Sequence, residues 1–239
     1  MNKRELISGQ IYHIYSRGVD KRKIFLDDKD YLRFIHDLFE FNDEAPVLNL
    51  GHFFNKNPYI DSVNQYIGRK AKEAKEKRKL LVEILAFCLM PNHYHLLLKQ
   101  KKDGGITKFM SKLGIGYVNY FNQKYERSGV LFQGRFKSVL INQEAHFIHL
   151  PYYIHLNPLD LIESKWGEKE IKDYKRAVKF LESYRWSSYL DYIGKKNFPS
   201  VTSREFLNQF FSGPEEYKKE TMKWLREIEI KELQNKLLE

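Results

Sequence analysis

The chain has 239 residues, of which 42% are hydrophobic and 15% aromatic, so it can bury a substantial core as one large domain or as a domain with appendages. Its 41 basic and 31 acidic residues give a net charge of +10, which favours a polyanionic partner such as nucleic acid. The sequence has no run of about 18 apolar residues, no secretory signal and only one cysteine, Cys88, so we expect a cytoplasmic, nucleoid-associated protein without membrane spans or internal disulfides.

Alternating β-forming side chains indicate strands, and apolar residues at helical spacing indicate helices. In chain order, these patterns predict a strand at 10–16, a helix at 28–39, a hairpin of strands at 80–90 and 93–99, a helix at 106–125, a strand at 130–141 kinked at Gly134, a helix at 143–156 with a kink or restart at Pro151, and helical segments from 166 onward. The segment 42–79, which ends in a charged run, is interpreted as an insertion.

The order β-α-β-β-α-β predicts an α+β protein with a ferredoxin-like (RRM-like) antiparallel sheet. We expect helices on one face of this sheet and an added helical region at the C-terminus. The predicted division is a main domain at 1–165 and a helical extension at 166–239.

Two histidines follow the tight bend that Pro91-Asn92 predicts in the hairpin. Side chains alternate between the faces of a strand, so His93 and His95 point the same way and Tyr94 the other. Two imidazoles on a rigid strand make half of a divalent-metal site. A His-x-His pattern alone, however, is more often the polar face of a sheet.

A second unusual stretch lies in the predicted helix 143–156, where Tyr153 shares a face with Asn157, four residues later. A tyrosine hydroxyl, with a pKa of about 10, is a poor nucleophile at neutral pH. Near a metal that polarises a phosphate it becomes a workable one, and the product is a covalent phosphotyrosine. The Asn157 amide could supply a third, neutral metal ligand. Tyr117 and Tyr120 are rival nucleophiles, but neither has an asparagine four residues on.

At these residues the sequence resembles the HUH-type Y1 transposases, the IS200/IS605-like group, and especially their REP-associated tyrosine transposase relatives. The resemblance covers about residues 11–189 and lies in five blocks: Tyr12-His13-Ile14-Tyr15-Ser16-Arg17-Gly18, Met90-Pro91-Asn92-His93-Tyr94-His95-Leu96, Phe132-Gln133-Gly134-Arg135-Phe136-Lys137-Ser138, Tyr153-Ile154-His155-Leu156-Asn157-Pro158 and Trp186-Ser187-Ser188-Tyr189.

This resemblance implies that His93 and His95 hold Mg²⁺ or Mn²⁺ and that Tyr153 attacks single-stranded, hairpin-bearing DNA. The products would be a 5′-phosphotyrosine and a free 3′-OH, and the resemblance also implies a homodimer. Insertion-sequence members carry Tyr-x-x-x-Gln, whereas Asn157 is one methylene shorter, as in REP-associated members. This difference concerns the third ligand and not the histidine pair.

Three basic residues, Arg17, Arg135 and Lys137, are predicted to contact DNA phosphates, with plain surface charge as the alternative. His149 and His155 are interpreted as surface or packed histidines rather than DNA contacts. Two other functions fit the sequence. One is an RRM-like protein that binds single-stranded nucleic acid without catalysis. The other is a metal-dependent hydrolase without a covalent step.

Overall fold

The computed structural model describes residues 6–45, 78–142, 144–163, 171 and 173–227. Most of the predicted insertion at 42–79 therefore lies outside the described residues, as does the predicted C-terminal helix beyond Glu227. No helix in these ranges is both long enough and apolar enough to cross a membrane.

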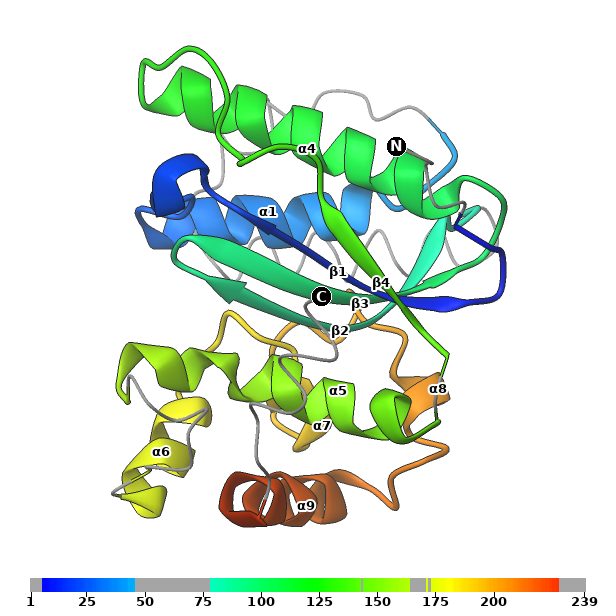
Figure 1. Cartoon of the computed structure of the whole chain (residues 1–239), viewed down its shortest axis with the longest axis vertical. Coiled ribbons are helices and arrows are strands. Elements are labelled where there is room, and N and C mark those ends of the chain that lie inside the picture. Colours follow the sequence, from blue (N-terminus) through cyan, green and yellow to red (C-terminus); the bar gives the residue numbers. More distant parts are fainter. Residues whose placement is uncertain (1–5, 46–77, 143, 164–170, 172, 228–239) are drawn as a thin grey trace.

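A four-stranded antiparallel sheet forms the centre of the fold (Figure 1). Its strands, in the spatial order β2-β3-β1-β4, are β1 (Ile11–Arg17), β2 (Val82–Met90), β3 (His93–Gln100) and β4 (Lys137–Ile141). Helices α1 and α4 make the two crossover connections, which confirms the predicted ferredoxin-like arrangement. The register places Tyr15 opposite His95 and Arg17 opposite His93, so the end of β1 lies beside the start of β3.

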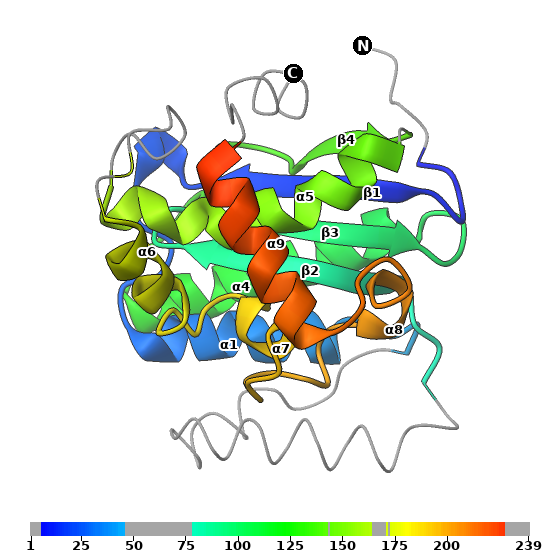
Figure 2. The same cartoon turned by 90° about the horizontal axis from the view of Figure 1, so that it is seen from below.

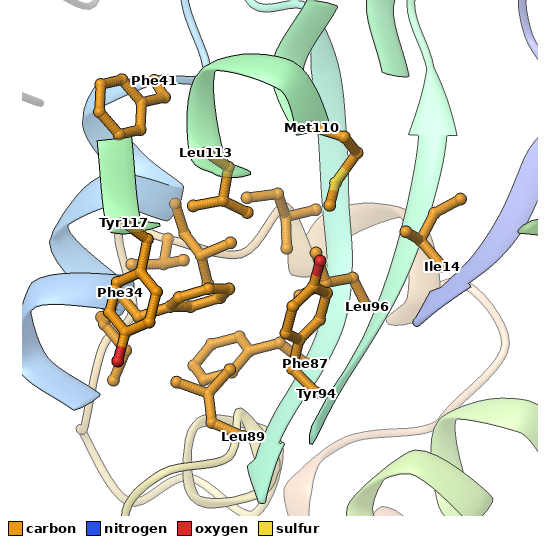
Figure 3. Packing of buried hydrophobic residues seen from close by; sticks show 14 of the residues in the cluster. Ile14, Phe34, Phe41, Phe87, Leu89, Tyr94, Leu96, Met110, Leu113 and Tyr117 are labelled. Atoms are coloured by element: carbon orange, nitrogen blue, oxygen red, sulfur yellow. The ribbon is translucent and has the colours of Figure 1, made fainter. Parts of the chain in front are cut away.

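Helices α1 (Asp28–Glu40) and α4 (Gly105–Lys124) cover one face of the sheet. The first begins at a capping box, in which the side chains of Asp27 and Asp30 each accept a hydrogen bond from the other's backbone N–H. Side chains from both helices and from the sheet interdigitate in a buried core, which Figure 3 shows for Ile14, Phe34, Phe41, Phe87, Leu89, Tyr94, Leu96, Met110, Leu113 and Tyr117.

Two glycines of α4 give a matched test of this packing. A Cβ atom on Gly116 would collide with the buried ring of Phe41, whereas one on Gly114 would meet nothing within 4 Å. We expect Gly116→Ala to lower the free energy of unfolding by about 1 kcal/mol or more, because the ring must move. Gly114→Ala should raise it by about 0.5–1 kcal/mol, because alanine favours the helix. Urea denaturation measures both, and a change of the same sign in the two variants would contradict this packing.

The opposite face of the sheet is covered by later helices (Figures 1 and 2). They are α5 (Glu144–Leu156), the 3₁₀ helix η2 (Asn157–Leu161), α6 (Tyr174–Leu181), α7 (Tyr189–Tyr192), α8 (Arg204–Leu207) and α9 (Pro214–Glu227). Helix α5 continues through Pro151, so the predicted restart does not occur.

The segment before α7 covers the free edge of β2. The backbone N–H of Leu89 donates to the carbonyl of Trp186, and the N–H of Ser188 donates to the carbonyl of Phe87. Residues after 166 therefore contact the central sheet directly. The proposed boundary between 1–165 and 166–239 remains a prediction.

One predicted strand is shorter than the sequence indicated. The pattern at 130–141 predicts a single strand, but β4 starts only at Lys137. Gly134 has a φ of 129°, a conformation that favours glycine. Just before it, the backbone N–H of Gln133 donates to the carbonyl of Arg17, the last residue of β1. After β1 the chain forms the short 3₁₀ helix η1 (Val19–Lys21). The prediction was wrong because alternating side chains here belong to a segment that turns around the end of the sheet.

Candidate active site

A pocket of about 430 Å³ lies where β1 ends and β3 begins, on the face of the sheet that α5 covers. This volume is large enough for a small ligand or part of a nucleotide chain. Its walls are formed by Tyr15, Ser16, Arg17, His93, His95, Gln133, Arg135, Lys137, Tyr153, Asn157 and Asp160. The structure therefore brings together all seven predicted site residues, which come from β1, β3, α5, η2, β4 and the segment leading into β4.

His93 and His95 reach the pocket from β3, while Tyr94 and Leu96 lie in the core on the other side of the sheet, as the strand alternation predicts. Burial, followed by the positive charge of Arg17, lowers the pKa of His93 to about 4. Burial, followed by neighbouring histidines and Arg17, holds the pKa of His95 well below its usual value. Both imidazoles are therefore neutral at pH 7, the form that binds metals.

Each of these histidines uses its Nδ1 atom in a hydrogen bond. His93 Nδ1 lies 2.6 Å from Asn92 Oδ1, and the amide nitrogen of Asn92 donates to the carbonyl of Lys21. The Asn92 oxygen is thus the acceptor, and His93 carries its proton on Nδ1. His95 Nδ1 lies 2.8 Å from His13 Nε2. The atoms left to bind an ion are the two Nε2 nitrogens.

This donor set fits a divalent ion such as Mn²⁺ or Mg²⁺ only in part. Imidazole nitrogens are good ligands for transition metals, and such ions also accept oxygen ligands. Within the described ranges, no group of three or more His, Cys, Asp or Glu residues is arranged to hold an ion. A third protein ligand would therefore be an amide such as that of Asn157, with the remaining positions left for water or substrate.

Tyr153 lies directly beside His95 and His13. Its ring centroid is 5.9 Å from that of His95 and 6.3 Å from that of His13, in edge-on geometry. Asn157 begins η2, and its amide nitrogen donates to the carbonyl of Tyr153 at 2.8 Å. This bond orients the amide and leaves its oxygen as the end that could bind an ion.

The rival tyrosines lie on the other face of the sheet. Tyr117 donates a hydrogen bond to the carbonyl of Ile24, and Tyr120 donates to the carboxylate of Asp30. Both are on α4, in the core that Figure 3 shows or against it. Neither lines the pocket.

A buried histidine holds α5 against the C-terminal helices. His155 Nδ1 lies 2.6 Å from the Tyr217 hydroxyl and His155 Nε2 lies 2.7 Å from the Ser188 hydroxyl. These contacts tie the helix that carries Tyr153 to α9 and to the edge of β2. His149 on the same helix accepts a hydrogen bond from the Trp224 indole. Both histidines are packed, in line with the interpretation from sequence.

The burial of His155 predicts a pH-dependent stability. Burial lowers its pKa to about 3, whereas an unfolded histidine titrates near 6.5. Protonation therefore favours the unfolded chain, and stability falls as the pH drops from about 6.5 toward 3. Between pH 7.5 and 5.5, wild type should lose about 1.4 kcal/mol more of its free energy of unfolding than His155→Gln does. Urea denaturation at both pH values measures this; equal losses would contradict it.

Five further residues at the site were not predicted from the sequence: His13, Tyr15, Ser16, Gln133 and Asp160. A signal existed for the first two, because they alternate with Arg17 on β1 and so share its face of the sheet. Gln133 and Asp160 had no comparable signal, since their positions depend on the turn before β4 and on η2.

Comparison with known proteins adds independent evidence. Residues 54–157 match the family model described as "Transposase IS200 like". The resemblance to the IS200-like transposases is confirmed. The matched segment contains His93, His95, Tyr153 and Asn157. No curated protein matches the chain.

Among solved structures, this chain is similar to a REP-associated tyrosine transposase bound to a REP hairpin. The two share 13% sequence identity over 85% of this chain and 90% of that one, with a TM-score of 0.46.

Proposed function

We propose that this protein is a transposase-like enzyme that cuts and rejoins single-stranded, hairpin-bearing DNA through a covalent 5′-phosphotyrosine. The observation that carries the proposal is the convergence of Tyr153, His93 and His95 in one pocket rimmed by exposed basic side chains. The match to IS200-like transposases supports the same reaction class. The resemblance also implies a homodimer, in which each chain would contribute one Tyr153 and one histidine pair.

In this mechanism His93 and His95 would hold Mg²⁺ or Mn²⁺ through Nε2, and the Asn157 oxygen would supply a third ligand. When bound, the ion would polarise the scissile phosphate. The Tyr153 oxygen attacks phosphorus in line, forming a phosphotyrosine bond as the bond to the 3′ oxygen breaks. The phenol of Tyr153 loses one proton and the departing 3′ oxygen gains one, so the step balances. Attack by another 3′-OH reverses the step and releases Tyr153, so no ATP is consumed.

Arg17, Arg135 and Lys137 would bind the phosphates of the strand that enters the pocket. Changing any one of them to alanine should weaken DNA binding and reduce the slope of log K against log [salt] by about 0.7. Lys101→Ala is the matched control. Lys101 comes directly after β3, at the opposite end of that strand from His93, and forms an ion pair with Glu83. Fluorescence anisotropy over a salt series measures the slopes. A Lys101→Ala slope reduced as much as the others would contradict this assignment.

The test of the proposed function is incubation of the protein with labelled hairpin oligonucleotides and Mn²⁺. We expect a cleaved product and a protein–DNA adduct that survives SDS, both abolished by EDTA. An RRM-like binder would hold the oligonucleotide equally well in EDTA and form no adduct. A hydrolase without a covalent step would give cleavage without an adduct.

A further inference from the structure

We infer that His13 is a positioning residue that fixes the tautomer and the ring orientation of His95. This inference rests on the proposed function, in which His95 is a metal ligand. His13 lies on β1 and is fully buried, and its Nε2 atom is 2.8 Å from His95 Nδ1. The sheet sets this contact through its register, because the residue two positions after His13, Tyr15, pairs directly with His95.

The ring of His95 is enclosed on several sides. The His13 ring lies nearly parallel to it, with centroids 5.1 Å apart and planes 16° apart, and the Tyr15 ring lies 6.0 Å away at 25°. The rings of His93 and Tyr153 meet it edge-on at 5.1 Å and 5.9 Å. Because His95 is only 4% exposed, its ring is held among these neighbours, and the hydrogen bond to His13 engages its Nδ1 atom.

The direction of the bond follows from what the pocket requires. If Nδ1 of His95 donates to Nε2 of His13, then Nε2 of His95 keeps a lone pair for an ion. The opposite direction puts the proton of a neutral His95 on Nε2 and blocks that atom. Asn92 provides the precedent within this site, since its oxygen accepts the Nδ1 proton of His93. Metal-binding histidines commonly donate their second ring N–H in this way, which also fixes the ring.

His13 therefore accepts the Nδ1 proton of His95, just as Asn92 accepts the Nδ1 proton of His93. The two acceptors differ in kind: one is a neutral amide anchored to the carbonyl of Lys21, and the other is a neutral imidazole buried under α5. A change at His13 should thus alter His95 and leave the tautomer of His93 unchanged.

The experiment compares wild type with His13→Phe, which keeps an aromatic ring but has no acceptor, and with His13→Gln, whose amide oxygen can still accept. Nitrogen-15 NMR of the metal-free proteins reports the tautomers. We expect the Nδ1–H form of His95 in wild type and His13→Gln, a shift away from it in His13→Phe, and an unchanged His93 in all three. Mn²⁺ affinity, measured by EPR, should fall about 10–100-fold in His13→Phe and recover largely in His13→Gln.

An Nε2–H form of His95 in wild type, or the same tautomer in wild type and His13→Phe, would overturn the inference. A purely structural role would lower the melting temperature of His13→Phe without moving the His95 tautomer, which also overturns it. If wild type bound no Mn²⁺ while the tautomer shift appeared, the proposed function would fail and the positioning role of His13 would stand.

Discussion

Tyr153→Phe should form no detectable covalent DNA adduct in Mn²⁺, while its fold and its affinity for hairpin DNA stay close to those of wild type. The substitution removes only the oxygen that would attack phosphorus. The ring that packs edge-on against His95 and His13 is kept. SDS gel electrophoresis with end-labelled oligonucleotides measures the adduct, and circular dichroism and anisotropy check the fold and the binding.

Two matched variants make this result specific. Tyr15→Phe tests the other tyrosine of the pocket, whose pKa is raised further above neutrality by burial. Tyr152→Phe tests the neighbouring position on α5, where the ring is buried and stacks on Tyr217 instead. Both should still form the adduct. If Tyr153→Phe formed it and Tyr15→Phe did not, the nucleophile would be assigned to β1 rather than to α5.

Much of this site was predictable because strand and helix periodicity are local properties. Alternation along β3 places His93 and His95 on one face, and the four-residue spacing places Tyr153 near Asn157. The order of the elements then indicated the sheet topology. None of these patterns states which face of the sheet the late helix covers. That contact depends on buried links such as the one from His155 to Tyr217 and Ser188, which join segments far apart in the sequence.

The errors arise where a structure depends on contacts between distant parts of the chain. The segment before Lys137 has the alternation of a strand, but its hydrogen bonds go to the end of β1 rather than along it. The bond between His13 and His95 joins residues 82 positions apart, so it depends on the pairing of β1 with β3 and cannot be read from either stretch alone. Predicting it would have required the register as well as the topology.

The histidine pair carries the second large effect. His93→Ala or His95→Ala should slow Mn²⁺-dependent adduct formation by about 10³-fold or more, because loss of a ligand removes metal stabilisation worth several kcal/mol. Binding of the hairpin in EDTA should change little, since the basic rim of the pocket is intact. Single-turnover kinetics over an Mn²⁺ titration measure the rate, and raised Mn²⁺ should rescue part of it if the lost interaction is a metal ligand.

The residue between the histidines supplies the control. Tyr94 has its side chain in the core on the opposite face of the sheet, so Tyr94→Phe removes a buried hydroxyl without reaching the pocket. It should cost about 1 kcal/mol of stability and leave the Mn²⁺ dependence at the wild-type value. Adduct formation that survives the loss of either histidine at the wild-type rate, with the same requirement for Mn²⁺, would mean that the ion binds elsewhere. The alternation of β3 would then describe only the polar face of a sheet.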